Sequence, residues 1–297
     1  KYSVISSKPQ AIYEWAINFK KKYPNQKIAV ACELKKGPLI YALEKHSHLV
    51  IFPINPSTVA KYRKAFTQSG AKDDPSDALI QAEILDRHMD KLRPIFPEDC
   101  DIRALKQLVE NRRKLVQNRV GLSNLITATL KNYYPQVLDW FNEKDTVIFC
   151  NFIIKWPTLA DAKKARKQTL INFFQQNKSR YTHVNERRIE EIKMAFPLTD
   201  DGGVIEPNKI MVEVLIPQLK LLIEGIEHFD KEIKQRYKNQ RDKYIFDSFP
   251  GAGPQLSPRL LVAFGVNRCR YTTASEIQKM SGIAPVLERS GQKSWTH

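Results

Sequence analysis

The stretch Lys27-Ile-Ala-Val-Ala-Cys-Glu33 decides the fold of the first third of the chain, because its apolar run predicts a strand that ends at a carboxylate. A second apolar run, Leu49–Pro53, predicts another strand, and a short strand is expected at Tyr2–Ile5. Apolar residues recur at helical spacing in Pro9–Lys22, and a second helix is expected at Pro38–Lys45. Strands and helices that alternate in this order predict a parallel or mixed α/β sheet.

Three carboxylates accompany this pattern. Two more helices are expected beyond the last strand, at Ser57–Phe66 and Pro75–Met89. Asp74 and Asp77 stand at i, i+3 where the second of these helices begins, and Glu33 emerges at the sheet edge where α/β proteins usually place ligands. Mg²⁺ takes oxygen ligands in octahedral geometry and usually only a few carboxylates. The sequence therefore predicts a Mg²⁺ site made by Glu33, Asp74 and Asp77.

The same acidic residues have a purely structural interpretation. Asp74 is a good N-cap, Pro75 suits the first helical position, and Asp77 at the third position completes a capping box. Asp73 is an equally good cap by residue type, so either neighbour can begin the helix. On spacing alone, capping is favoured over metal binding.

The balance of charge favours a polyanionic partner. The 297 residues include 48 Lys and Arg against 32 Asp and Glu, which gives a net charge of +16 and a pI near 9.6. Nucleic acid is the first candidate. No run reaches the roughly 18 apolar residues of a membrane-spanning helix, and no signal-peptide pattern opens the chain. We therefore expect a cytoplasmic protein without a membrane partner.

Cysteine and histidine spacing argues against zinc chemistry. The four cysteines are far apart and form no C-x-x-C pair, and the six histidines show no H-E-x-x-H spacing. A disulfide scaffold is also unexpected in so long a chain.

Two long amphipathic helices are expected in the middle of the chain, at Asp101–Tyr133 and Asn208–Gln240, and their length predicts helix pairing or a coiled coil. The expected apolar stripe of the first helix is Leu105, Leu108, Val109, Leu115, Val116, Val120, Leu125 and Ile126. Basic residues beside that stripe are expected to contact phosphate, namely Arg112, Arg113, Lys114 and Arg119. Between the long helices lies a helical insert, Asp145–Asn177, rich in aromatic and basic residues.

The tail from Phe249 differs from the rest. Phe249–Phe264 resembles a helix-hairpin-helix element, in which Gly251 and Gly253 let backbone N–H groups approach a phosphate. A further helix is expected at Thr273–Ser281.

Ser290 stands in the basic loop Glu288-Arg-Ser-Gly-Gln292. A serine before a glycine is ordinarily only a turn residue. A hydroxyl attacks phosphorus only if its deprotonation is assisted and a cation neutralises the phosphate. Arg289 and Lys293 are the neighbouring candidate cations, and the sequence does not place them relative to the hydroxyl.

Taken together, these residues resemble the DEDD insertion-sequence transposases, a family whose members include bridge-RNA-guided recombinases. The resemblance covers nearly the whole chain. The parts that carry it are the apolar strand ending in Glu33, the match of Lys72-Asp-Asp-Pro-Ser-Asp-Ala78 to a K-T-D-x-x-D-A pattern, the basic helix Leu105–Tyr134, Pro250-Gly-Ala-Gly-Pro254, and Ser281-Gly-Ile-Ala-Pro285 followed by Ser290-Gly291.

The resemblance implies an α/β plus α architecture in three parts. Residues 1–98 would form an RNase H/RuvC-like α/β domain whose first strands are missing. Residues 99–245 would form coiled-coil helices with a helical insert at about 140–200, and residues 246–297 a truncated, small helical transposase domain. Glu33, Asp74 and Asp77 would be the second, third and fourth acidic residues of the DEDD set.

The sequence departs from the family pattern at three places. The family's first aspartate is expected on the opening strand, yet no aspartate precedes Asp73, and we expect that residues before Lys1 are missing. Asp73 replaces the threonine before the third acidic residue, and Gln292 replaces the usual second glycine after the serine.

The family mechanism would have Ser290 attack a DNA phosphodiester to form a covalent phosphoserine link, with Mg²⁺ on the carboxylates neutralising the phosphate charge. The implied partners are donor and target DNA, a structured guide RNA, and further copies of the chain in a dimer or tetramer, acting at the nucleoid of a bacterial or archaeal cell.

Two alternatives stay open. One is a metal-dependent nuclease of the Holliday-junction-resolving type, which shares the acidic residues and needs no serine. The other is a non-catalytic nucleic-acid-binding scaffold in which the carboxylates serve only as helix caps.

Overall fold

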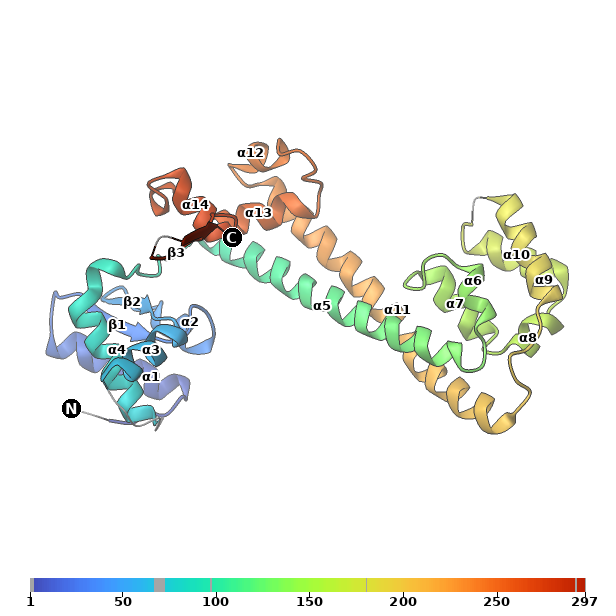
Figure 1. The fold of residues 1–297 in the computed structure, drawn as a ribbon, viewed down its shortest axis with the longest axis horizontal. Helices are drawn as coiled ribbons and strands as arrows, with labels where there is room; N and C mark the ends of the chain where they lie inside the picture. The colour runs from blue at the N-terminus through green and yellow to red at the C-terminus, as the bar shows by residue number, and fades with distance from the viewer. Residues whose placement is uncertain (1–2, 67–72, 97, 180, 292, 297) are drawn as a thin grey trace. The chain divides into compact units, whose positions relative to one another are not determined.

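The computed structural model describes residues 3–66, 73–96, 98–179, 181–291 and 293–296 (Figure 1). The chain divides into two compact units, Lys1–Glu98 and Asp99–His297. Helices make up most of the described residues, with two small sheets. Among the helices of this described part, none is long and apolar enough to cross a membrane.

The first unit is a small α/β arrangement. Its strands are β1 (Ile28–Cys32) and β2 (Leu49–Pro53), which pair in parallel with Ile28 opposite Leu49. The accompanying helices are α1 (Pro9–Lys22), α2 (Pro38–Leu43), α3 (Pro56–Phe66) and α4 (Asp74–His88), followed by the short 3-10 helix η1 (Met89–Lys91). The two apolar runs are therefore confirmed as strands, and their parallel pairing agrees with the expected parallel or mixed sheet.

The strand expected at Tyr2–Ile5 is wrong for Ser3–Ile5, which adopt no regular structure, while Tyr2 lies outside the described residues. Val4 is 82% exposed, so this segment buries little apolar surface. A short segment without a paired neighbour lacks the ladder hydrogen bonds that stabilise a strand. Apolar composition alone was not enough to predict a strand there.

Buried side chains from the helices and from the two strands form the core of the first unit. The largest cluster joins one face of α1 to the sheet and to α2, through Ile12, Ala16, Cys32, Ile40, Leu43, Leu49 and Ile51. A second cluster, Ile54, Val59 and Ile84, packs α3 and α4 together. Helix α4 also packs against β1, which brings the start of α4 into the same unit as Glu33.

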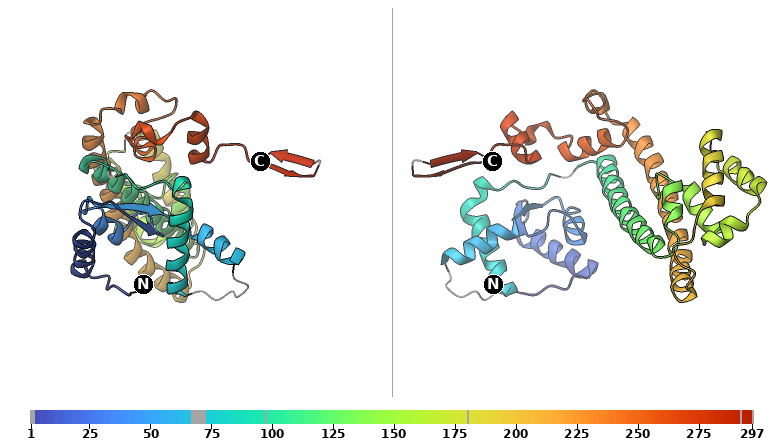
Figure 2. Two further views of the ribbon diagram at one scale, coloured as in Figure 1. Left: turned by 90° about the vertical axis from the view of Figure 1, so that its left-hand side faces the viewer. Right: turned by 45° about the vertical axis from the view of Figure 1, so that its right-hand side comes forward.

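The second unit is organised around two long helices, α5 (Cys100–Lys131) and α11 (Gly202–Lys238), which lie side by side in Figures 1 and 2. They run antiparallel, because Arg236 near the end of α11 pairs with Asp101 at 3.8 Å. At the other end, the side-chain amide of Asn132 donates to Asn208 at 3.2 Å. The predicted helix pairing is confirmed.

The start of α11 lies six residues earlier than expected. The carboxylate of Asp201 accepts from the N–H of Gly203 at 2.8 Å and so caps the helix. Two residues expected in the apolar stripe of α5 are also wrong, since Val120 and Leu125 are 49% and 44% exposed. Leu105 and Ile126 of the same expected stripe have no exposed surface.

The insert between the long helices is helical, as predicted. It comprises α6 (Gln136–Trp140), α7 (Val147–Lys155), α8 (Leu159–Lys164), α9 (Lys167–Gln176) and α10 (Thr182–Met194). Phe152 has no exposed surface, and its ring contacts the rings of Trp140, Phe141, Trp156, Phe173 and Phe174. This aromatic core continues into α5 and α11 through buried residues such as Ile126, Leu130 and Ile216.

The last part of the chain contains α12 (Lys243–Asp247), α13 (Leu256–Phe264), the 3-10 helix η2 (Arg268–Arg270), α14 (Ala274–Ser281), β3 (Leu287–Ser290) and β4 (Lys293–Thr296). Helices α12 and α13 share one core with α5 and α11, through Ile102, Leu105, Ile233, Tyr237, Phe246, Leu261 and Val262. This shared core crosses the domain boundary expected at residue 246. Strands β3 and β4 form an antiparallel hairpin that periodicity did not predict (Figure 2).

Candidate functional site

The start of α4 is capped by Asp73. Its side chain accepts from the backbone N–H of Ser76 at 3.1 Å and from the Ser76 hydroxyl, and these hydrogen bonds hold the pKa of Asp73 below its ordinary value. Asp74 is therefore the first helical residue and Asp77 the fourth. A capping box needs its acidic residue at the third helical position, which is Ser76. The capping interpretation is wrong for Asp74 and Asp77, because their neighbour performs that role. Residues 67–72, which include Lys72 of the motif, lie outside the described residues.

Asp77 has a different partner. Its carboxylate accepts from the guanidinium of Arg63 on α3, and the side chains of Asp77 and Arg63 are only 17% and 15% exposed. A charge-assisted bond in such a half-buried place is stronger than a surface ion pair. The carboxylate of Asp77 is therefore held toward α3 by a cation.

Glu33 directly follows β1 and is exposed, as the sequence predicted for a residue at the end of a strand. Asp74 is also exposed. Within the described ranges, no three His, Cys, Asp or Glu side chains gather in a way that could hold a metal ion. The structure thus places Glu33, Asp74 and Asp77 in one unit without bringing their carboxylates together as ligands.

Three of the four basic residues of α5 have intramolecular partners. Arg112 donates to both carboxylate oxygens of Asp230 on α11. Arg113 donates to Glu110 at 2.8 Å. Lys114 is exposed, and no ion pair of its side chain occurs within the part of the chain that the structure describes. Lys114 is therefore the residue of this set best placed for phosphate.

Arg119, the remaining member of the set, joins α5 to the insert. Its Nε lies 3.2 Å from a carboxylate oxygen of Asp145, and both side chains are about two-thirds buried, at 29% and 31% exposure. Arg112 and Arg119 thus stabilise the packing of the second unit. Phosphate contact by either residue requires its ion pair to open.

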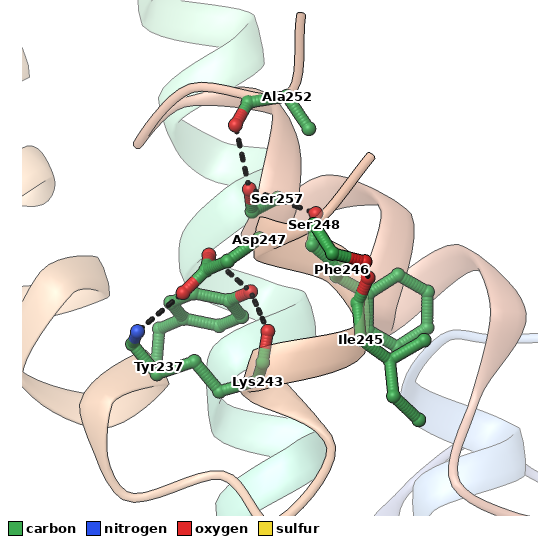
Figure 3. A network of polar contacts seen from close by, with 8 residues as sticks. All are labelled: Tyr237, Lys243, Ile245, Phe246, Asp247, Ser248, Ala252 and Ser257. Atoms are coloured by element: carbon green, nitrogen blue, oxygen red, sulfur yellow. Dashed lines mark hydrogen bonds and ion pairs between the residues drawn. The ribbon is translucent and has the colours of Figure 1, made fainter. Parts of the chain in front are cut away.

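A network of polar contacts holds the end of α11 against α12 and α13 (Figure 3). The hydroxyl of Tyr237 donates to the carboxylate of Asp247 at 2.9 Å and lies 3.1 Å from the carbonyl of Lys243. Lys243 pairs with the same carboxylate, which lowers the pKa of Asp247. Burial and the hydrogen bond to Asp247 raise the pKa of Tyr237 to about 12.

The same network reaches the glycine-marked turn. The buried hydroxyl of Ser257 lies 3.2 Å from the carbonyl of Ala252 and 3.3 Å from that of Phe246 (Figure 3). Gly251 has a φ of +77°, a conformation that glycine adopts readily and other residues adopt with strain. The N–H groups of Ala252 and Gly253 donate to Phe249 and Gly251 within the turn. The expected phosphate contact of this turn therefore does not use those two N–H groups in the present arrangement.

Ser290 is the last residue of β3, and all described residues of the hairpin are exposed. It lies opposite Lys293 across the ladder, and Gly291 begins the tight turn with a φ of +59°. Directly opposite residues share one face of a sheet, and neighbours along a strand alternate between faces. Lys293 is therefore on the face of Ser290, whereas Arg289 lies on the other face, opposite Ser294.

Sequence reasoning missed Arg63 and the Tyr237 network. Arg63 lies fourteen residues before its partner Asp77, and nothing in that spacing indicates contact between two helices. Tyr237 falls within the long helix expected at Asn208–Gln240, and helical spacing does not show that its hydroxyl finds a carboxylate on the next helix.

Two family models match this chain. One, described as a transposase and covering the DEDD transposases of the IS110 type, matches residues 5–135. The other, described as the transposase IS116/IS110/IS902 family, matches residues 243–297. The first range contains all three candidate carboxylates, and the second contains Ser290.

Curated relatives agree with the family models. The chain is 31% identical over 272 residues to the mini-circle putative transposase for IS117 of Streptomyces coelicolor, which covers 90% of this chain and 65% of that protein. It is 24% identical over 260 residues to the insertion element IS116 uncharacterized 44.8 kDa protein of Streptomyces clavuligerus, covering 86% of this chain and 63% of that protein. The chain thus spans less than two thirds of the length of each of these relatives.

Proposed function

Because this chain belongs to the IS116/IS110/IS902 family of transposases, we propose that it cuts and rejoins the DNA of a mobile element through a serine nucleophile. The observation that carries this proposal is the place of Ser290 at the end of an exposed strand, directly opposite Lys293. An exposed hydroxyl beside a cation can meet a phosphodiester without rearrangement of a core. RuvC-like character of the first unit is part of the same proposal.

The proposed step forms a covalent bond between Ser290 Oγ and phosphorus. The bond from phosphorus to one sugar oxygen breaks, the serine proton passes to a base, and the departing sugar oxygen takes up a proton. The ammonium of Lys293 favours the step, because it stabilises negative charge on the phosphoryl oxygens where the charge grows. Arg289, on the opposite face, is better placed to hold the neighbouring backbone of the DNA.

A covalent-adduct assay tests the serine. Labelled element-end DNA incubated with the protein is expected to migrate with it on a denaturing gel, and Ser290→Ala is expected to abolish that species. Ser294→Ala is the matched control, because Ser294 lies on the adjacent strand and on the other face. Strand cleavage without any adduct in the wild-type protein would contradict the proposal and favour a metal-dependent nuclease.

Mg²⁺ enters the proposal through the residue types of the first unit. Glu33, Asp74 and Asp77 are oxygen donors of the kind Mg²⁺ prefers, and the matched DEDD model is consistent with dependence on acidic residues. In their present arrangement they do not form an ion site, because Asp77 pairs with Arg63 and the three are not gathered among the described residues. Binding requires Asp77 to exchange Arg63 for the ion.

Calorimetric titration with Mg²⁺ tests that exchange. Asp77→Asn is expected to weaken binding, and Asp86→Asn on the same helix is the matched control, since Asp86 is exposed near the other end of α4. Equal Mg²⁺ affinity of the wild-type protein, Asp77→Asn and Asp86→Asn would show that Asp77 is not a ligand of the ion. Arg63→Gln is expected to strengthen binding if the guanidinium competes with Mg²⁺.

Assembly into a homo-oligomer is a further part of the proposal. Helix α11 carries exposed apolar residues at i, i+4, i+7 and i+11, which are Ile210, Val214, Pro217 and Leu221. This spacing is typical of a coiled-coil seam, and the stripe is separate from the positions that α11 buries against α5. We propose a second copy of the chain as its partner. Leu221→Glu is expected to reduce the mass measured by light scattering, and Leu198→Glu, at an exposed position outside both long helices, is the control.

The nucleic-acid partners proposed are donor and target DNA together with a structured guide RNA. The net charge of +16 supports polyanion binding in general and does not distinguish RNA from DNA. Purification from the native host followed by RNase treatment tests the RNA: loss of strand exchange after digestion is expected, and unchanged exchange would remove RNA from the proposal. We place this activity in the cytoplasm, at the nucleoid.

A further inference from the structure

An exposed aromatic ring stands on a well-held backbone in the insert. Phe196 lies two residues after the end of α10, and its side chain is 84% exposed. The carbonyl of Phe196 accepts from the side-chain amide of Gln136, and the carbonyl of Ala195 accepts from Lys163 at 2.7 Å. The backbone beneath the ring is therefore fixed at two successive residues while the ring itself faces solvent.

A lysine ammonium lies beside this ring. The ammonium of Lys163 lies 6.0 Å from the centroid of Phe196. Lys193, near the end of α10, donates in turn to the carbonyls of Lys163 and Ala165, so the end of α8 and the end of α10 are joined by two lysine side chains. The segment from Lys155 to Lys178 contains six Lys and Arg against a single acidic residue. The helices α8 and α9 thus carry an excess of positive charge, and one of their lysines lies beside the exposed ring.

A hollow of about 290 Å³ opens between the beginning of α9 and the end of α10. Its lining is Lys167, Ile189, Glu190, Lys193 and Met194. Ile189 and Met194 supply an apolar surface, Lys167 and Lys193 supply charge, and Glu190 supplies an acceptor for N–H groups. The volume lies just below the roughly 300–1,000 Å³ of typical small-molecule pockets.

From these contacts we propose that the insert binds an unpaired nucleotide of a single-stranded nucleic acid. A base stacks on Phe196, two residues after Met194 of the hollow, and Lys163, Lys167 and Lys193 contact the flanking phosphates. Base stacking on an exposed aromatic ring is tolerant of sequence, and the faces of paired bases inside a duplex are already covered by their neighbours. The surface therefore selects looped or single-stranded segments over duplex.

This inference goes beyond the proposed strand-transfer reaction. The surface lies in the part of the chain between the two matched family ranges, which end at residue 135 and begin at residue 243. It also uses none of Glu33, Asp74, Asp77 and Ser290. The two proposals consequently fail separately: Ser290→Ala is expected to leave binding by the insert unchanged.

Fluorescence anisotropy with the whole chain tests the surface. The probes are single-stranded DNA and RNA of about 12 nucleotides, within the usual footprint of a stacking surface, and a duplex of the same sequence. Phe196→Ala is expected to weaken single-strand binding about tenfold, or about 1.4 kcal/mol, and to leave duplex binding unchanged. Phe196→Trp is expected to restore it. Tyr244→Ala is the matched control, because Tyr244 is 71% exposed on α12.

Salt titration separates the lysines from general charge. Lys167→Ala is expected to reduce the slope of log affinity against log salt by about 0.7, the value for one phosphate of a single strand. Lys178→Ala removes the same charge beyond the other end of α9 and is expected to change the slope less. Comparison of the DNA and RNA probes identifies which single strand is preferred.

Two outcomes would overturn the inference. One is equal single-strand affinity for the wild-type protein and Phe196→Ala, with circular dichroism showing both folded. The other is a change in mass by light scattering for Phe196→Ala together with unchanged nucleic-acid affinity, which would make the surface a protein interface. Equal weakening by Phe196→Ala and Tyr244→Ala would also contradict a specific site.

Discussion

The aromatic core of the insert and the β3–β4 hairpin are opposites in how they are stabilised. The core buries large side chains from α5, α6, α7, α9 and α11, many of them with no exposed surface. Every described residue of the hairpin is exposed, and its order rests on one ladder and a glycine turn. An isolated two-stranded hairpin is at best marginally stable in water. The residue proposed for covalent chemistry therefore lies where the chain by itself supplies least stability.

The candidate catalytic carboxylates of the first unit also lie outside a buried core. Glu33 and Asp74 are exposed, and Asp77 is held by a cation instead of by other carboxylates. Buried aromatic residues stabilise the scaffold. The groups proposed for catalysis are exposed or ion-paired, and in the proposal they gain their partners from a substrate, an ion or another subunit. The residues that stabilise this chain and the residues proposed for its chemistry therefore lie in different parts of it.

The largest effect is expected in the aromatic core. Phe152→Ala removes a ring that contacts five others and is expected to lower the free energy of unfolding by about 3–5 kcal/mol, through lost transfer energy and a residual cavity. Denaturant unfolding followed by tryptophan fluorescence measures it. Ile154→Ala on the same helix is the control, since Ile154 is 53% exposed. Equal losses in both variants would show that burial does not set the difference.

A smaller loss of stability is expected at the pair between the long helices. Arg112→Ala leaves the half-buried carboxylate of Asp230 without its donor and is expected to cost about 1.5–3 kcal/mol. Lys114→Ala is expected to leave unfolding unchanged and to weaken nucleic-acid binding instead. Unfolding and anisotropy measurements on both variants test this assignment, and the reverse pattern would refute it.

The Tyr237 network is expected to contribute less than the core. Tyr237→Phe removes the hydroxyl bonded to Asp247 and is expected to cost about 0.5–1.5 kcal/mol near neutral pH. The folded-state pKa of Tyr237 is raised from 10.0 to about 12, so its contribution is complete below pH 10 and is lost as the pH rises from 10 toward 12. The stability difference between the wild-type protein and Tyr237→Phe is therefore expected to shrink over that interval. A difference that grows with pH would contradict the network.

At the start of α4 the effect is expected to be local. Asp73→Ala removes the cap and should speed amide exchange in the first turn several-fold, whereas Asp74→Ala should not. The pKa of Asp73 is lowered by its bonds to Ser76, so this capping is present above the ordinary pKa of an aspartate and is lost as the pH falls through the lowered value. Hydrogen exchange resolves the two variants. Equally fast amide exchange in Asp73→Ala and Asp74→Ala would show that both aspartates cap the helix.

The smallest effect on stability is expected at the hairpin. Ser290→Ala is expected to change the free energy of unfolding by no more than about 0.5 kcal/mol, because the side chain is exposed. The same variant is expected to lose the covalent adduct entirely. Thermal unfolding and the adduct assay on one preparation provide the test. A large loss of stability in Ser290→Ala would show that the hairpin packs as part of a core, and it would contradict the difference drawn between the hairpin and the insert.

Much of the fold followed from periodicity. The bounds of Pro9–Lys22 and Leu49–Pro53 agree with those of α1 and β2, because each segment begins and ends at a clear change of pattern. The strand expected near Ser3 failed for want of a partner strand, and the hairpin at Ser290 was missed because its exposed strands carry no apolar alternation. Local pattern therefore predicted elements with a buried face and failed for elements without one.

Composition, periodicity and motifs were enough to predict the family resemblance, the excess of positive charge, the order of the main elements and the candidate catalytic residues. The folded chain was needed to show that Asp73 is the cap, that Asp77 pairs with Arg63, and that Lys293 rather than Arg289 shares the face of Ser290. The physical reason is distance along the chain. Composition and spacing report what a helix or strand buries, whereas the partner of a single charge or hydroxyl depends on which elements fold against each other.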